Sequence, residues 1–278
     1  MALTKPLPCV DGMFLPAFPH MLKDARQHLE DISNLSTRKD DIIIGSYPKS
    51  GNHWMNEIVP RLLSKSQNIS HELLHSFLDF LPDLKTLESI SSPRVLTTHL
   101  PYRYLPKEHI ENAGKIIHII RNPKDVVVSA FHHFTKDKYV LEYHSAIWED
   151  FLDDFIRGDC VYRSWFDQEL EWEKVALQNP DSVLVLYYED MHKNGLENVM
   201  RMSEFLGLPC DETFAKIVLN ESTFKNVKEK KGSYYPIEFY RKGVIGDWKS
   251  KFTVAQNEKF DCIFKEKMKD SKLNIHFT

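Results

Sequence analysis

The sequence predicts an α/β protein in which helices flank a central, mostly parallel β-sheet. Three short apolar runs, rich in β-branched residues and followed by polar or turn-forming residues, predict buried strands at 41–47, 115–121 and 182–190. A weaker fourth candidate spans 93–101. Helical patterns lie between these runs, and each connection is long enough for a strand–helix–strand crossover, which favours parallel pairing.

The predicted helices cover 52–64, 125–134, 145–158, 164–177 and 195–207. No repeat, low-complexity tract or Gly/Ser linker divides the chain. We therefore expect a single domain over residues 1–278.

Composition limits the classes of partner. Of the 278 residues, 42% are hydrophobic and 27% are charged, as in an ordinary soluble globular protein. The formal charge of -4 gives no general attraction to nucleic acid or membranes, so an anion site requires a local cluster of basic groups. Four widely spaced cysteines suit reduced thiols better than disulfides or a zinc site. With no signal peptide and no long apolar run, we expect a cytoplasmic protein without a membrane or nucleic-acid partner.

In sheets of this kind, ligands bind at the carboxyl ends of the strands. Four features follow predicted strands: the loop at Lys49, His99, Arg121 and the acidic pair Glu189–Asp190. Because parallel strands end at the same edge, these features predict an active site there.

The stretch YPKSGNHW, ending at Trp54, resembles a phosphate-binding loop in which the order has changed. The usual nucleotide loop places glycine before lysine, whereas here Lys49 precedes Gly51. Backbone N–H groups at the start of the following helix, together with the lysine, favour an anion. Gly51 allows close approach of the backbone to a ligand, and Trp54 can stack on a base.

Two further basic clusters are present. Arg121 ends a strand and Ser129 lies two turns into the following helix, and an arginine fork with a hydroxyl suits a terminal phosphate monoester. A late loop contains Arg241, Lys242 and Gly243. In a net acidic chain, these clusters and the Lys49 loop are best explained by a ligand with two phosphate-bearing ends.

A metal-dependent small-molecule kinase is one alternative, with Glu189 or Asp190 holding magnesium. The Lys49 loop departs from the ATP-loop order where a hydroxyl should bind that metal. A sulfuryl group carries less charge than a phosphoryl group, so lysine and backbone donors can stabilise its transfer without a metal. The pattern therefore points away from phosphoryl transfer.

His99, in the stretch TTHLP, is the candidate general base. It follows a strand and precedes the turn imposed by Pro101, and histidine accepts protons near neutral pH.

The stretches YPKSGNHW, THLP, RNPKDVVVSAFHHF, YYED and RKGVIGDWKSKFT resemble the signature sequences of the cytosolic sulfotransferases, in the family's order. The similarity runs from Asp41 to Phe264. It implies a single domain related to nucleotide kinases, with a P-loop-like donor site. It also implies that 3′-phosphoadenosine 5′-phosphosulfate (PAPS) is the sulfuryl donor and adenosine 3′,5′-bisphosphate (PAP) a product.

The resemblance assigns catalytic roles to Lys49, at the bridging or leaving 5′-phosphate oxygen, and to His99, which takes the acceptor's proton during in-line attack on sulfur. The implied donor-binding residues are Lys49, Ser50, Gly51, Asn52 and His53 in the loop, Trp54, Tyr188, Ser222 and Phe224 around adenine, and Arg121, Ser129, Arg241, Lys242 and Gly243 at the 3′-phosphate.

The acceptor is expected to be a small hydroxyl- or amine-bearing compound. It is also expected to be flat or lipophilic, because aromatic side chains line the implied pocket. Residues 1–40 are expected to contribute to its pocket. The implied lining residues are Phe14, Phe18, Phe77, Phe80, His99, Tyr139 and Tyr240. A PAPS-using dehydratase on the same scaffold is a second alternative. A family stretch that forms a homodimer contact corresponds to Lys249, Thr253, Val254 and Glu258.

The chain departs from the family pattern at three places. Asn52 and His53 replace two threonines, Thr97 replaces a lysine two residues before the base, and Arg163 stands where glycine is common. Loss of an electrostatic contact such as the lysine can cost ~10²-fold in rate. We predict an active enzyme that is slower or tuned to an unusual acceptor.

Overall fold

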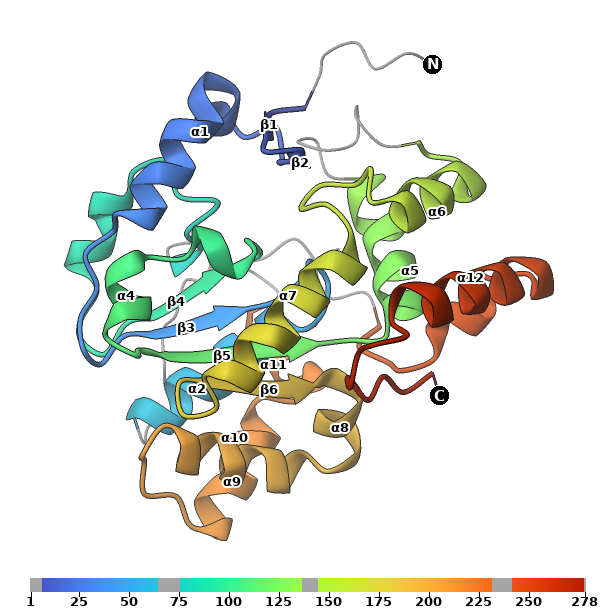
Figure 1. Cartoon of the computed structure of the whole chain (residues 1–278). Coiled ribbons are helices and arrows are strands. Elements are labelled where there is room, and N and C mark those ends of the chain that lie inside the picture. The colour runs from blue at the N-terminus through green and yellow to red at the C-terminus, as the bar shows by residue number, and fades with distance from the viewer. Residues whose placement is uncertain (1–6, 65–75, 137–144, 232–241, 278) are drawn as a thin grey trace.

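The structure is a computed structural model that describes residues 7–64, 76–136, 145–231 and 242–277. Its centre is a four-stranded parallel sheet in the order β4-β3-β5-β6 (Figure 1). The strands are β3 (Ile42–Gly45), β4 (Val95–Thr98), β5 (Lys115–Ile120) and β6 (Val183–Tyr187). All four predicted strands, including the weaker one, are present, but the prediction was wrong over 188–190, where β6 has ended at Tyr187 and α8 (Tyr188–Lys193) begins. The register places Ile44 beside Thr97 on one side and Ile117 on the other.

Alternation along the strands divides the core into two layers. Ile43 and Ile116 join a cluster with Trp172 of α7 (Trp165–Gln178), which crosses one face of the sheet (Figure 1). Ile44 belongs to a second cluster with Met55 of α2 (Asn52–Ser64) on the opposite face. Both faces are therefore covered, which is why the strands read as continuous apolar runs.

The five predicted helices are present as α2, α5 (Pro123–Phe134), α6 (Trp148–Arg157), α7 and α9 (Gly195–Phe205). Other elements lacked a clear prediction. They are β1 (Cys9–Val10), β2 (Met13–Phe14), α1 (Pro19–Ser33), η1 (Leu84–Ser89), η2 (Tyr102–Tyr104), α4 (Lys107–Glu111), α8 (Tyr188–Lys193), α10 (Glu212–Glu221), α11 (Phe224–Lys231), η4 (Asp247–Ser250) and α12 (Val254–Lys267).

Local signals fix the start of the helices near the sheet edge. The side chain of Asn122 accepts a hydrogen bond from the N–H of Lys124, and Pro123 occupies the first turn of α5. At α12, Thr253 and Gln256 form a reciprocal capping box. The expected cap at Asn122 is confirmed.

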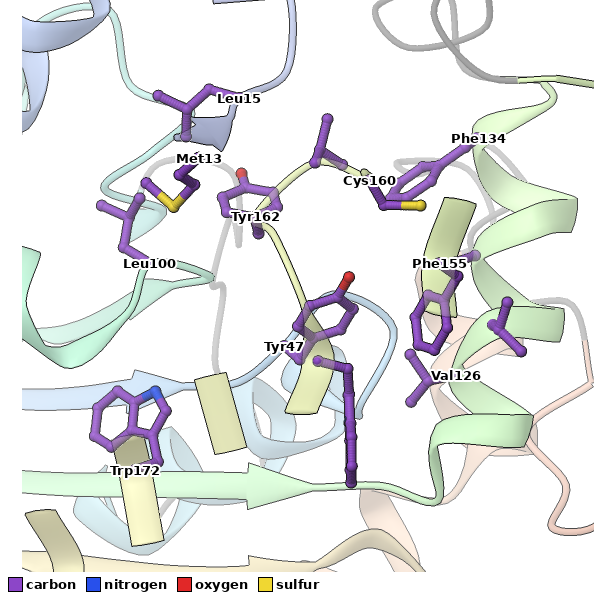
Figure 2. Close-up of a cluster of buried hydrophobic side chains, with 14 of the residues drawn as sticks. Met13, Leu15, Tyr47, Leu100, Val126, Phe134, Phe155, Cys160, Tyr162 and Trp172 are labelled. Atoms are coloured by element: carbon purple, nitrogen blue, oxygen red, sulfur yellow. The ribbon is translucent and has the colours of Figure 1, made fainter. Parts of the chain in front are cut away.

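Tyr47, directly after β3, anchors the basic loop to the core. It is buried and packs edge-on against Phe155 of α6, at 6.0 Å between ring centroids. Figure 2 shows it among apolar side chains that include Val126 of α5. Its hydroxyl donates to the carbonyl of Arg163 at 3.0 Å. This contact joins the loop after β3 to the segment that leads into α7.

An unexpected ion pair lies between β5 and α7. Nε2 of His118 is 2.6 Å from a carboxylate oxygen of Glu169, and both side chains are 0% exposed. The indole of Trp172 stacks on the imidazole at 4.3 Å. A buried pair of this kind is costly to break one side at a time.

Among the described residues, no helix is long and apolar enough to cross a membrane. All four cysteines lie in described segments and none forms a disulfide.

Candidate active site

The carboxyl ends of the four strands carry the predicted functional groups in a fixed order. His99 follows β4, the Lys49 loop follows β3, Arg121 follows β5 and Tyr188 follows β6. Neighbouring strands are about 4.8 Å apart, so the edge from His99 to Tyr188 spans roughly 14 Å. That length suits an extended nucleotide, with the candidate base at one end and the aromatic group at the other.

The imidazole of His99 is held by the chain that precedes the Lys49 loop. Its Nδ1 is 2.9 Å from the carbonyl oxygen of Ser46. Because a carbonyl only accepts, Nδ1 carries the proton and Nε2 keeps a lone pair for a proton from a substrate. The amide of Asn52 lies 3.3 Å from the same Nδ1. The structure places the amide nitrogen of Asn52 at this position, so with Nδ1 protonated toward Ser46 this contact is not a hydrogen bond.

Burial lowers the pKa of His99, against the opposing effects of the Asp79 charge and the Ser46 carbonyl, while the charge of Lys49 lowers the pKa further. A lowered pKa keeps the imidazole neutral at pH 7, which is the form that a general base requires.

The loop after β3 has an unusual backbone. Lys49 has φ 71° and Gly51 has φ 125°, both in the region that favours glycine. A Cβ on Gly51 would lie 3.0 Å from the ring of Tyr188 and 3.1 Å from Ile119. The predicted need for glycine at position 51 is therefore explained by close packing against the neighbouring strands. Ser50 is buried, and Lys49 and His53 are half-buried.

Arg121 is buried and joins the Lys49 loop to the late basic loop. Its guanidinium donates to the carbonyl of Lys49 at 3.1 Å and to the carbonyl of Val244 at 3.0 Å, and lies over the ring of Tyr188 at 4.3 Å. The late loop is fixed further by Asp125, which accepts from the N–H groups of two of its residues, Gly246 and Trp248.

The other residues predicted to bind the 3′-phosphate differ in their exposure and partners. Ser129 is half-buried in the second turn of α5. Lys242 is exposed and its ammonium pairs with Asp247 at 2.6 Å, while Gly243 has φ 65°. Arg241 lies outside the described residues, so the convergence of Lys49, Arg121 and Arg241 remains a prediction.

Aromatic side chains gather at the β6 end of the edge. Trp54 and Tyr188 are edge to face with centroids 5.6 Å apart, and His192 lies 4.7 Å from each ring. Ser222, the last residue of the predicted adenine group with a described side chain, is buried at the end of α10. The side chain of Phe224 lies outside the described atoms.

Several buried polar atoms at this edge have no hydrogen-bond partner among the described residues. They are Ser50 Oγ, Trp54 Nε1 and Arg121 Nε, and Ser222 Oγ at the end of α10 is likewise unpartnered. Buried polar groups in proteins are normally paired. These donors therefore fit a ligand that brings several oxygen acceptors, as a nucleotide with two phosphate-bearing ends does.

Aromatic rings pack close to the imidazole of His99. Phe77 and Phe80 stack on each other at 4.3 Å and lie 5.0 and 6.0 Å from the imidazole. Phe18 contacts Phe80 at 5.0 Å. Phe14 is half-buried in β2, while Tyr139 and Tyr240 lie outside the described residues. Three of the predicted wall residues are thus brought together beside the base.

The acidic pair after β6 has local structural partners. A carboxylate oxygen of Glu189 accepts from the N–H of Asn122 at 3.1 Å, and Asp190 lies 3.5 Å from Nε2 of His276. Within residues 7–64, 76–136, 145–231 and 242–277, no group of three or more His, Cys, Asp or Glu residues is arranged to hold a metal.

Thr97 and Asn52, two of the positions at which the chain differs from the family pattern, are joined through hydrogen bonds to Asn56. The buried Thr97 hydroxyl donates to Asn56 at 3.0 Å, and the amide of Asn56 donates to the carbonyl of Asn52 at 2.9 Å. Because Asn52 also contacts His99, a polar chain links β4 to the base. Arg163 is exposed with φ 69°, which is a physical reason for glycine to be favoured there.

Sequence reasoning missed three residues near the base. Tyr162 places its ring edge-on to His99 at 5.4 Å, and Figure 2 shows its place in the buried cluster. Asp79 contacts the backbone of His99 at 3.0 Å. Burial, followed by the charges of Lys49, His53 and His99, lowers the pKa of His133 to about 2. The only sequence feature that could have indicated Asp79 is its position between Phe77 and Phe80, which were predicted to line the acceptor pocket.

The fold and the edge of the sheet together define a nucleotide-dependent transferase. Residues 39–272 match the sulfotransferase domain family. Mouse sulfotransferase 1A1 is 34% identical over 287 aligned positions, covering 96% of this chain and 95% of that protein. Dog sulfotransferase 1B1 is 36% identical over 268 positions, covering 88% of this chain and 89% of that protein. The chain therefore belongs to the PAPS-dependent sulfotransferase family.

Solved structures agree. The crystal structure of mouse sulfotransferase SULT7A1 complexed with PAP has a TM-score of 0.80 at 32% identity, with 94% of each chain covered. A retinol dehydratase complexed with androsterone and the inactive cofactor PAP has a TM-score of 0.78 at 23% identity, covering 91% of this chain and 88% of that one. At that identity the second likeness shows the fold alone.

Proposed function

We propose that this sulfotransferase moves the sulfuryl group of PAPS to a hydroxyl or amine of a small, lipophilic or aromatic acceptor, with His99 as general base. One observation carries the proposal. The imidazole is fixed through Nδ1, has a lowered pKa, and lies between the Lys49 loop and the rings of Phe77 and Phe80. A base between a phosphate loop and an aromatic wall is placed to join the two substrates.

In the proposed reaction, Nε2 of His99 takes the proton from the acceptor as the acceptor's oxygen or nitrogen attacks sulfur in line. The bond between sulfur and the bridging oxygen of the 5′-phosphate breaks at the same time. Lys49 and the N–H groups at the start of α2 stabilise negative charge on the departing phosphate. The products are a sulfate ester or sulfamate and PAP.

The donor site extends along the same edge. We propose that Arg121 and Ser129 bind the 3′-phosphate, with Arg241, Lys242 and Gly243 completing that group. Trp54 and Tyr188 hold the adenine. The unpartnered buried donors at Ser50, Arg121 and Ser222 support this assignment, as does the PAP complex of the mouse relative.

The decisive experiment compares His99→Ala with wild type, using labelled PAPS and a panel of phenols, alcohols and amines. We expect H99A to lose transfer and to keep its affinity for PAP in calorimetry. His109→Asn is the matched control, because His109 is also buried with a lowered pKa but lies beside Lys115 at the start of β5. Equal loss of transfer and of PAP affinity in H99A would mean that His99 is structural.

Calorimetry also separates the alternatives. Tighter binding of PAP than of 5′-AMP supports the 3′-phosphate site, whereas magnesium-dependent binding of ATP would support a kinase. Analysis of the product formed from a simple phenol separates a sulfate ester from a dehydrated product.

We further propose that the enzyme forms a homodimer through Lys249, Thr253, Val254 and Glu258. All four residues are exposed, and Val254, at 76%, is the most exposed large hydrophobic side chain in the described part of the chain. Val254→Asp should convert the dimer to a monomer in light scattering, whereas Leu177→Asp, at a separate hydrophobic residue that is 62% exposed, should not. We place the enzyme in the cytoplasm, where its unpaired cysteines would stay reduced.

A further inference from the structure

A buried carboxylate lies behind the backbone of His99. Asp79 is 0% exposed; one of its oxygens accepts from the backbone N–H of His99 at 3.0 Å, and the other accepts from the Thr98 hydroxyl at 2.5 Å. We propose that Asp79 is a positioning residue for the transfer reaction, which fixes the placement of the His99 imidazole and keeps a negative charge behind it. This inference rests on the proposed role of His99.

The contacts define where His99 sits. Its N–H is held by Asp79, its carbonyl accepts from the amide of Gln168 at 2.9 Å, and its Nδ1 is fixed by Ser46. The Thr98 hydroxyl that donates to Asp79 also accepts from the N–H of Leu100 at 3.0 Å. The base is therefore held by groups from three separate parts of the chain, and Asp79 is the only charged group among these contacts.

This arrangement differs from a histidine–carboxylate pair joined through the ring. The carboxylate of Asp79 bonds to the main chain and to a hydroxyl, and the ring nitrogen is bonded to a carbonyl instead. Replacement of Asp79 should therefore alter the position of the whole residue and the field at the ring, without changing which ring nitrogen carries the proton.

The same short segment carries the aromatic wall. Phe77 and Phe80 flank Asp79 in sequence, and both rings face His99. The N–H of Leu78 donates to the carbonyl of Thr97 at 2.9 Å, which fastens the segment to β4. One carboxylate thus fixes the base relative to the surface against which an acceptor would pack.

Charged and titratable groups around His99 set the expected pH effect. The Asp79 charge raises the pKa of His99, while burial and Lys49 lower it. His133, on α5, is coupled electrostatically to His99, and Tyr162 meets the ring edge-on. Loss of the Asp79 charge removes the larger of the two effects that favour the imidazolium and leaves only the Ser46 carbonyl to oppose burial and Lys49, so the pKa of His99 should fall.

The test is Asp79→Asn, which keeps the shape of the side chain and removes its charge. We expect PAP affinity to stay within about twofold of wild type, because the donor groups lie on other strands. We expect the NMR-measured pKa of His99 to fall below its wild-type value, and kcat/KM with PAPS and 4-nitrophenol to fall about tenfold, as for other groups that orient a catalytic base.

Asp41→Asn is the matched control. Asp41 is also buried, but it pairs with Arg94 at the amino end of β3, so D41N should lower stability without moving the pKa of His99. An unchanged His99 pKa in D79N, or an equal change in D79N and D41N, would overturn the inference. The NMR titration needs no acceptor, so this failure is distinct from failure of the proposed function, which H99A reports.

A second pair of variants keeps the test decisive if D79N does not fold. Thr98→Val removes the hydroxyl that holds Asp79, whereas Thr98→Ser retains it. We expect T98V to lose about three- to tenfold in kcat/KM and T98S to recover most of that loss, at unchanged PAP affinity. Equal activity of T98V and T98S would contradict the positioning role.

Discussion

Gly51 provides a quantitative test of how the donor loop is built. Replacing it by alanine forces a side chain into a backbone with φ 125°, a region in which non-glycine residues cost about 1–3 kcal/mol. The added Cβ also lies 3.0 Å from the Tyr188 ring and 3.1 Å from Ile119. Overpacking of this kind costs about 1–3 kcal/mol more. We expect G51A to lose about 3 kcal/mol of unfolding free energy.

Gly207 isolates the conformational part of that cost. It has φ 67°, close to the left-handed region, and an added Cβ there meets no atom within 4 Å. Gly207→Ala should therefore cost only about 1–2 kcal/mol, the usual penalty for a left-handed residue with a side chain. The difference between the two variants measures the contact of the loop with Tyr188 and Ile119.

Urea unfolding gives both free energies, and calorimetry gives PAP affinity. We expect G51A to weaken PAP binding about tenfold or more, because the Tyr188 ring and the Lys49 loop must move apart, while G207A binds as wild type does. If G51A and G207A were alike in stability and in PAP affinity, close packing at Gly51 would not be what shapes the site.

Two further predictions concern buried histidines. Because His118 and Glu169 are both fully buried, His118→Leu leaves an unpaired carboxylate and should cost about 3–5 kcal/mol, whereas the double variant with Glu169→Leu should recover most of that loss in urea unfolding. Burial and the charge of Lys49 lower the pKa of His133 in the folded protein to about 2, from 6.5 in the unfolded chain. The folded state therefore resists protonation of this imidazole, so the free energy of unfolding is highest above pH 6.5 and decreases as the pH falls below that value. Wild type should lose about 1.4 kcal/mol more than His133→Asn between pH 7.5 and 5.5.

Each of these has an outcome that contradicts it. A double variant at His118 and Glu169 no more stable than H118L would show that the pair is not coupled. Equal loss of stability by wild type and H133N at pH 5.5 would show that His133 titrates normally in the folded protein.

The sequence by itself determined the four strands and the functional groups that follow them, whereas the order of those groups along the edge came from the structure. Buried parallel strands need continuous apolar runs, so all four were visible, and a residue that follows such a strand must lie at the carboxyl edge. That logic placed the Lys49 loop, His99, Arg121 and the Glu189–Asp190 pair at one edge, and Tyr188 was added by the family resemblance. It also singled out Gly51 as a residue that lets the backbone approach a ligand closely, whereas its positive φ was found only in the structure.

The tertiary structure alone decided which groups hold these residues in place. Asp79 reaches His99 across 20 positions, Arg121 reaches Val244 across 123, and His118 meets Glu169 across 51. Contacts at such separations leave no periodic or spacing signal, because they depend on how whole segments pack and not on neighbours in the chain. The residues of the candidate site could therefore be predicted from the sequence, whereas the groups that hold His99 in place could be found only in the folded structure.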